Sequence, residues 1–311
     1  ARALQLYVIL DLHAVQGWQN PGWHCDNAGG EAHFWGQKVF EDRAVALWEE
    51  LARRYRDEPT VAGYNVMNEP DAEDATWLNH FYRRVTAAIR AIDARHILFL
   101  EGNHWSQQFH QLDAPFDGNT VYSTHNYVEP GLSGAEYPGE VQGQFYDRAR
   151  LEKEYLERAA FMRQYHVPNW VGEFGCLYTG GPADAVRLRV LADMMDIIEG
   201  QGHHWTIWTY KDVGWMGAVY VDPQSDWAER TRPVRQAKTA WRCDSWIERG
   251  ESEIDQHIRQ IVAYAQKVAP DQPVDWARLR ESLSVAVHDL VLARSLLPAF
   301  AEQFRGMTEN D

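Results

Sequence analysis

The sequence contains little cysteine, and its cysteines are scattered. Cys25, Cys176 and Cys243 are the only three, and they form no Cys-x-x-Cys pair. Such a set is too small for a disulfide framework and lacks the spacing of a zinc or redox motif. Reduced thiols of this kind fit a cytosolic protein slightly better than a secreted one, so we favour a cytoplasmic location.

Three further features are missing. No run of about 18 apolar residues could span a membrane. No Gly-x-Gly-x-x-Gly or Walker-type loop follows the first apolar run, which counts against a nucleotide-binding sheet. Positive charge is in the minority, since the 311 residues carry a formal net charge of -15 and the pI is near 5.3. With no basic patch visible, we expect neither nucleic acid nor an anionic membrane as a partner.

Tryptophan, by contrast, is abundant. The chain has 14, and several are expected in loops or beside strand ends: Trp18, Trp23, Trp105, Trp208 and Trp215. A flat indole stacks on the apolar face of a sugar ring and offers an N–H to its hydroxyls. The excess therefore suggests a carbohydrate ligand, although most of these side chains could equally belong to a core.

Short apolar runs alternate with longer segments of mostly helical periodicity. The runs cover residues 5–12, 61–67, 96–100, 121–125, 169–174 and 204–208. Nearly continuous apolar strands between amphipathic helices indicate parallel strands covered on the outside. The sequence therefore predicts an α/β fold with six βα units, and the missing nucleotide loop favours a (β/α)8 TIM barrel over a doubly wound sheet.

The character of the chain changes near residue 245. Two helical stretches, 252–268 and 276–304, are joined by the turn-like segment 269–275. We therefore predict a barrel domain over residues 1–244 and a C-terminal helical hairpin within residues 245–311. The hairpin is expected to pack on the outside of the barrel or to bind a partner.

Polar side chains fall at the ends of the predicted strands. Because the C-terminal ends of barrel strands converge on one pocket, these residues are candidates for a site. Strand by strand they are Asp11 and His13, Asn68 and Glu69, Glu101 and Asn103, His125 and Tyr127, Glu173, and Trp208 with Lys211. Each alone has an ordinary explanation; Asn-Glu-Pro, for example, is common turn chemistry. Their shared register on successive strands is what points to a site.

Glu69 and Glu173 are a carboxylate pair of the kind that glycosidases use. One carboxyl group must hold a proton for the leaving-group oxygen, and the other must be ionised to attack or to activate water. Pro70 ends the preceding strand, because it lacks the N–H that a ladder needs, and so places Glu69 at the pocket rim. We expect Glu69 to have a raised pKa, and Glu173 to be kept ionised by hydrogen-bond donors.

Five segments, in order, resemble glycoside hydrolase family 5, in the clan of retaining (β/α)8 glycosidases. They are VILDLHAVQGWQN, YNVMNEP, THNY, VGEFG and WTIWTYKD, and the resemblance covers roughly residues 5–215. It implies a retaining β-glycoside hydrolase without metal or organic cofactor that cleaves β-linked glucosides or short β-glucans by double displacement. The first segment is most similar to the exo-glucanase and glucosidase-like branches.

The resemblance also implies a role for individual residues. Glu69 would be the acid/base and Glu173 the nucleophile. Asn68 would bind the sugar 2-hydroxyl, Tyr127 would hydrogen-bond Glu173, and His13 and His125 would contact sugar hydroxyls. Trp208 would be the stacking platform for the reacting sugar. Trp105 and Lys211, at the same predicted rim, complete the expected substrate-binding set.

Two departures from the family pattern stand out. The acid/base and nucleophile lie on the second and fifth predicted strands, whereas the family has them on the fourth and seventh, and the arginine that supports the nucleophile has no counterpart. Either the sequence lacks the start of the natural protein or the barrel is a six-stranded remnant. We expect the former, since an open barrel leaves strand edges unpaired. The C-terminal helices or a second copy of the chain, giving a homo-oligomer, are the other candidates to cover the opening.

Two other functions remain open at this point. The chain could be a non-catalytic carbohydrate-binding protein derived from such an enzyme, which the missing arginine favours and the retained glutamates disfavour. It could also be a metal-dependent hydrolase that uses His24, Cys25 and Cys176, or His203 and His204. No pair among these residues has the spacing of helical metal ligands, so we expect no metal site.

Overall fold

The structure is a computed structural model that describes residues 1–25, 27, 29–212, 216–243 and 252–308. It divides into two compact units. The first comprises Ala1–Asn20 and Ala32–Tyr220, and the second comprises Pro21–Glu31 and Val221–Asp311. The sequence predicts the boundary at residue 244, whereas the second unit begins at Val221 and takes in an early segment of the chain.

The first unit is built on a curled sheet of six parallel strands in the order β1-β2-β3-β4-β7-β8. The strands are β1 Val8–Asp11, β2 Val61–Asn65, β3 Ile97–Glu101, β4 Thr120–His125, β7 Asn169–Glu173 and β8 His204–Trp205. All six predicted strands are confirmed, although β8 is shorter than the apolar run 204–208. With β1 and β8 at its edges, the sheet forms the incomplete barrel that the sequence predicts.

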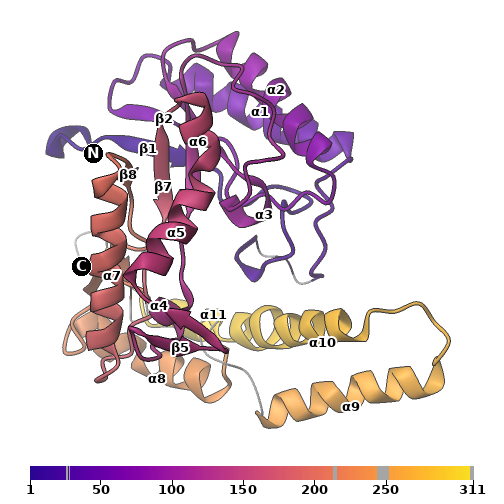
Figure 1. Cartoon of the computed structure of the whole chain (residues 1–311). Helices are drawn as coiled ribbons and strands as arrows, with labels where there is room; N and C mark the ends of the chain where they lie inside the picture. The colour runs from indigo at the N-terminus through magenta and orange to yellow at the C-terminus, as the bar shows by residue number, and fades with distance from the viewer. Residues whose placement is uncertain (26, 28, 213–215, 244–251, 309–311) are drawn as a thin grey trace. The chain divides into compact units, whose positions relative to one another are not determined.

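Helices cover the outside of this sheet (Figure 1). They are α1 Lys38–Tyr55, α2 Ala75–Arg90, α5 Arg148–Arg158, α6 Ala160–Tyr165 and α7 Asp184–Gly200. The short helices α3 Asn103–Ser106 and α4 Glu129–Ser133 follow the C-terminal ends of β3 and β4, and a 3-10 turn at Arg2–Leu4 precedes β1. The amphipathic faces of α1 and α2 bury Trp48 and Phe81 against the strands, in one apolar cluster with Tyr64 and Leu98. A second cluster joins α5 and α7 to β7. Burial of these apolar faces holds the helices on the outer face of the sheet. The C-terminal ends of the strands are therefore not covered by these helices and can form a site.

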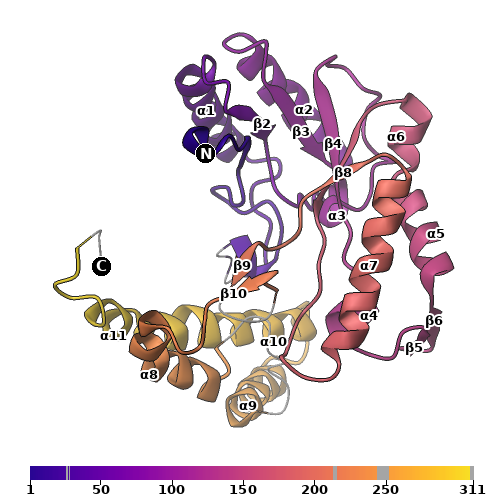
Figure 2. The same cartoon turned by 90° about the vertical axis from the view of Figure 1, so that its left-hand side faces the viewer.

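Two small sheets complete the first unit. β5 Gly139–Val141 and β6 Gln144–Tyr146 form an antiparallel hairpin between β4 and α5. β9 Lys211–Asp212 and β10 Val219–Tyr220 lie side by side (Figure 2) and pair in parallel. Both lie in connections that follow the C-terminal ends of large-sheet strands, where βα loops carry function in barrels.

The second unit is helical. Its elements are the 3-10 turn Trp23–Cys25, α8 Asp226–Ala240, α9 Glu253–Val268, α10 Trp276–Val285, the π-helix η3 Ala286–Ala293 and α11 Leu297–Glu302. α9 and α10 pack together as the predicted hairpin. The early segment joins them through Ser282, whose hydroxyl donates to the Gly29 carbonyl at 3.0 Å. Caps at Ser252 and Asp275 begin the two hairpin helices.

One helical segment of this unit, Trp276–Glu302, is long and apolar enough to cross a membrane by length and composition alone. The sequence shows no uninterrupted apolar run there, because Asp289 and Arg294 divide it. All three cysteines of the chain are buried, and none forms a disulfide within the described residues.

Candidate active site

The predicted site residues meet at the C-terminal ends of the parallel strands. Asp11 ends β1, Glu101 ends β3, His125 ends β4 and Glu173 ends β7, with His125 and Glu173 directly paired in the ladder. β2 reaches the same level by a short extension, since the Asn68 N–H still donates to the carbonyl of Leu12 at 3.1 Å. The common register that the sequence indicates therefore follows from parallel pairing.

Glu69 turns out of the sheet immediately after this extension. Its φ is 47°, in the left-handed region that residues other than glycine seldom adopt. The turn is held from both sides: the Glu69 N–H donates to Glu101 Oε2 at 2.7 Å, and the Asn20 side chain donates to the Glu69 carbonyl at 2.7 Å. The Gln19 amide holds the Asn68 carbonyl at 2.8 Å in the same way. Glu69 is only 8% exposed and is presented in one fixed backbone conformation.

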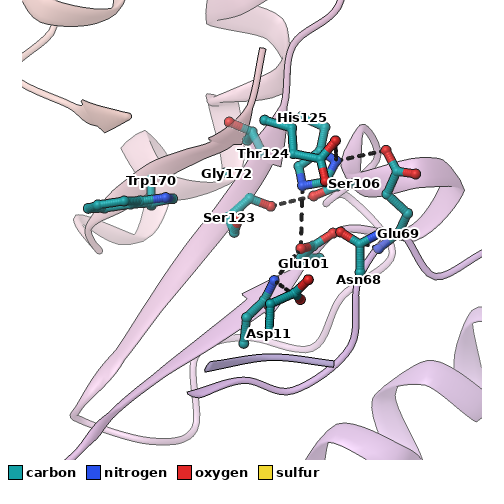
Figure 3. A network of polar contacts seen from close by, with 12 residues as sticks. Asp11, Asn68, Glu69, Glu101, Ser106, Ser123, Thr124, His125, Trp170 and Gly172 are labelled. Atoms are coloured by element: carbon teal, nitrogen blue, oxygen red, sulfur yellow. Dashed lines mark hydrogen bonds and ion pairs between the residues drawn. The ribbon is translucent and has the colours of Figure 1, made fainter. Parts of the chain in front are cut away.

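His125 lies at the centre of the site (Figure 3). Its Nδ1 is 2.7 Å from Glu69 Oε1 and 3.7 Å from Glu173 Oε2, and its Nε2 is 3.4 Å from Glu101 Oε1. Burial opposes a charge on this ring, but the carboxylates of Glu101 and Glu173 outweigh burial and raise the pKa of His125 well above 6.5. The ring is only 2% exposed. The sugar contact expected of His125 stays a prediction, and the carboxylates beside both ring nitrogens do not favour it.

Glu173 has the partner that the sequence predicts, and its surroundings raise its pKa. The Tyr127 hydroxyl donates to Glu173 Oε2 at 2.8 Å. Burial nevertheless raises the pKa of Glu173 to about 7, and the negative charges of Glu69 and Glu101 act in the same direction. The charge of His125 and the hydrogen bond from Tyr127 lower this pKa, but by less. The expectation that donors such as Tyr127 hold Glu173 ionised stays a prediction, because Tyr127 lowers this pKa while burial raises it. No arginine within the described ranges bonds this carboxylate.

The two catalytic candidates are close. One oxygen from each of Glu69 and Glu173 and one ring nitrogen of His125 all lie within 4.8 Å of one another. The same three atoms could hold a metal ion, since zinc accepts imidazole nitrogen and carboxylate oxygen. In the described part of the chain the alternative metal residues form no such group; Cys176 instead contacts the Arg187 carbonyl, and His203 contacts Tyr155.

His13 and Trp208 form one wall. Their rings stack at 5.3 Å with an interplanar angle of 12°, so His13 covers part of one face of the indole. Asp11 orients the imidazole through a 2.9 Å contact between its Oδ2 and His13 Nδ1. Burial lowers the pKa of His13, but the hydrogen bond and charge of Asp11, together with the charges of Glu173 and Glu69, outweigh burial and raise it. The stacking of a sugar ring on Trp208 stays a prediction. It would use the face of the indole that His13 does not cover.

Asn68 carries an unused hydrogen-bond donor beside Glu69. The residue is 1% exposed, and its side-chain nitrogen has no hydrogen-bond partner among the described residues. A buried amide without a protein partner is costly. The contact of Asn68 with a sugar hydroxyl stays a prediction.

The remaining candidates lie apart from this cluster of contacts. Trp105 packs its ring against the neighbouring His104, and its backbone N–H donates to the Pro70 carbonyl at 3.2 Å. Lys211 is exposed on β9 and, within the described residues, contacts none of the carboxylates. Trp18 is half-buried against His33, and Trp215 lies outside the described residues.

Sequence reasoning assigned no role to Gln19, Asn20 and Asn65, which hold the strand ends together. Asn65 donates to both Glu101 Oε1, at 2.7 Å, and Asp11 Oδ1, at 3.0 Å. Their signal in the sequence is weak, because an amide near a strand end usually serves a turn.

Comparison with known proteins shows the family of the chain. The family model described as cellulase (glycosyl hydrolase family 5) matches residues 1–214. A β-xylosidase from Phanerodontia chrysosporium is 34% identical and aligns with 98% of this chain and 67% of its own length. Cellodextrinase A from Ruminococcus flavefaciens is 27% identical, with 60% and 58% covered.

Solved structures agree on the fold. An endoglucanase from Thermotoga maritima superposes with a TM-score of 0.53 at 22% identity, covering 65% of this chain and 64% of that one. At this identity the likeness concerns the fold alone. The family model, by contrast, spans more than half of the sequence, including every strand of the large sheet. The chain belongs to glycosyl hydrolase family 5 and is a glycoside hydrolase.

Proposed function

We propose that the chain is a retaining β-glycosidase that cleaves β-linked glucosides or short β-glucans, with Glu69 as acid/base and Glu173 as nucleophile. The observation that carries the proposal is the buried pair itself, whose nearest oxygens lie within 4.8 Å. Carboxyl groups about 5 to 5.5 Å apart are typical of retaining enzymes, whereas inverting enzymes need about 6.5 to 9.5 Å to admit a water.

In the first step the Glu173 carboxylate attacks the anomeric carbon while Glu69 gives its proton to the glycosidic oxygen, so the aglycone leaves as an alcohol. In the second step Glu69 takes a proton from water, whose oxygen attacks the same carbon and releases Glu173. The Asn68 amide would donate to the hydroxyl beside the reacting carbon, a bond that can strengthen in the transition state.

The sugar at the reacting position has two candidates. The exo-glucosidase-like first motif favours glucose, and so does the presence of a relative named cellodextrinase A. Xylose is the second candidate, favoured because the relative that aligns with 98% of this chain is a β-xylosidase.

A panel of nitrophenyl β-glucoside, β-xyloside and β-mannoside tests this proposal. We expect turnover of the glucoside or the xyloside, and proton NMR of the first product should show the β-anomer before mutarotation. Release of the α-anomer would contradict the retaining mechanism. Sugar binding without any turnover would instead favour the carbohydrate-binding alternative.

The pH dependence follows from Glu173. Because the nucleophile must be ionised and burial raises the pKa of Glu173 to about 7, kcat/KM should rise with pH up to about 7. Replacing Tyr127 by phenylalanine removes a donor that lowers this pKa, so the rising limb should move to higher pH. A limb that stays in place or moves to lower pH in the Tyr127→Phe profile would contradict the assignment.

A further inference from the structure

Glu101 is a buried carboxylate that the two-step hydrolysis does not use. It ends β3 with 0% exposure and lies next to Glu69 and His125 (Figure 3). We propose that Glu101 is a positioning residue of the reaction, which fixes the Glu69 backbone with one oxygen and holds His125 with the other. The inference rests on the proposed acid/base role of Glu69.

The first oxygen holds a backbone conformation that needs support. Glu101 Oε2 accepts the Glu69 N–H at 2.7 Å. A glutamate at φ 47° persists only where its surroundings determine it, and such residues gather at active sites. A charged acceptor makes a stronger bond to this N–H than a neutral one would. Loss of the charge should therefore loosen the turn that aims the Glu69 carboxyl group.

The second oxygen acts through His125. Glu101 Oε1 is 3.4 Å from His125 Nε2, while Nδ1 of the same ring is 2.7 Å from Glu69 Oε1. The imidazole is thus held between the two carboxylates. Burial would raise the pKa of Glu101, but the charge of His125 and the hydrogen bonds from His125, Asn65 and the Glu69 N–H together outweigh burial and lower it. These contacts favour the ionised form of Glu101 in the interior.

The packing around this pair is specific. Gly172 of β7 lies against the ring, since an added Cβ would be 3.1 Å from His125 Nε2 and 2.4 Å from Ser123 Oγ. Glu101 itself is fixed by the Asn65 amide at 2.7 Å and by the Tyr82 hydroxyl, which donates to the Glu101 carbonyl at 2.8 Å. A rigid supporting group of this kind can hold a reacting carboxyl group in productive geometry.

Leaving-group dependence separates positioning from general damage. Glu101→Gln keeps the size of the side chain but removes its charge. We expect kcat/KM for alkyl β-glycosides, which need the proton of Glu69, to fall about 100-fold, the loss that a misplacement near 1 Å can cause. For dinitrophenyl β-glycosides, whose leaving group needs no proton, kcat/KM should fall far less. The 15N chemical shifts of His125 should move from imidazolium toward neutral imidazole.

Glu41→Gln is the matched control. Glu41 is also a buried acid, 7% exposed, but it lies on α1 and pairs with Arg84. Its replacement should lower the melting temperature without any leaving-group dependence. Should Glu101→Gln not fold, Asn65→Ala removes one donor to Glu101 and should give the same selective loss to a smaller degree.

The outcomes divide cleanly. An equal loss on both classes of substrate, in Glu101→Gln or in Asn65→Ala, would make Glu101 merely structural and overturn the proposal. If Glu69→Ala shows the selective loss and Glu101→Gln does not, only the positioning role fails. If Glu69→Ala itself shows no selectivity, the acid/base assignment fails and the positioning role falls with it.

Discussion

Replacing Glu173 by glutamine should lower kcat by about 10⁴- to 10⁶-fold, the order of loss seen when one catalytic group is removed from a hydrolase. A carboxamide has nearly the same shape but no charge, so it cannot form the glycosyl-enzyme bond. The Tyr127 hydroxyl can still donate to the carbonyl oxygen of the new side chain. Sugar binding should therefore survive, as measured by calorimetry with a sugar or an uncleaved oligosaccharide.

A solvent-exposed glutamate provides the control for this variant. Glu199 lies at the end of α7 and accepts a bond from the indole of Trp205, outside the predicted site. Glu199→Gln should leave kcat and sugar affinity unchanged. Parallel loss of turnover and binding in Glu173→Gln would show that Glu173 is structural.

The Glu173→Gln protein should also be more stable than the wild type at pH 8. Burial raises the pKa of Glu173 from 4.5 to about 7, so the folded state resists ionisation more than the unfolded state does. The stability linked to this group is present below pH 4.5 and is lost as the pH rises through 7. Glutamine does not ionise, and the gain at pH 8 should be at most about 3 kcal/mol, since the two pKa values differ by about 2.5 and each pKa unit corresponds to about 1.36 kcal/mol. A lower melting temperature at pH 8 than in the wild type would contradict the raised pKa.

The sequence carried most of the information on the fold because parallel strands buried on both faces are nearly continuous apolar runs. The run 61–67 and the strand Val61–Asn65 start at the same residue, and the run 121–125 and Thr120–His125 end at the same one. The run 204–208 predicted too long a strand. Thr206 and Trp208 still donate backbone bonds to Val171 and Phe174, but the chain leaves the regular ladder after Trp205.

The second unit contains a feature that local sequence patterns could not predict. The hairpin helices were visible from their own periodicity, whereas the attachment of residues 21–31 to them was not. That attachment depends on individual hydrogen bonds between residues far apart in the chain, such as the one that Arg278 donates to the Gly30 carbonyl. No local propensity encodes such a pairing.

The site divides in the same way. The partners Tyr127 and Glu173 could be predicted from their motifs, and their hydrogen bond is present. The balance of charges could not, because the pKa of Glu173 depends on its depth and on the distances to His125, Glu69 and Glu101 together. Likewise the sequence predicts that His125 contacts a sugar, whereas in the structure its two ring nitrogens face the carboxylates of Glu69 and Glu101.

Removal of the Glu69 carboxyl group should slow the two chemical steps differently. In Glu69→Ala no proton reaches the glycosidic oxygen, so kcat/KM for alkyl β-glycosides should fall about 10²- to 10⁴-fold, the usual contribution of a positioned acid. Dinitrophenyl glycosides should still transfer their sugar to Glu173. Their kcat should nevertheless fall, because no base then activates the water that releases the sugar.

Azide should restore that release. The anion needs no base, and the space left by the carboxyl group beside His125 Nδ1 would admit it. Its nitrogen would attack the anomeric carbon of the glycosyl-enzyme and displace the Glu173 carboxylate, giving a β-glycosyl azide. Wild-type enzyme, whose Glu69 repels the anion and activates water, should show no rescue. An α-glycosyl azide from Glu69→Ala would mean attack from the opposite face, and would reassign Glu69 as the nucleophile and Glu173 as the acid/base.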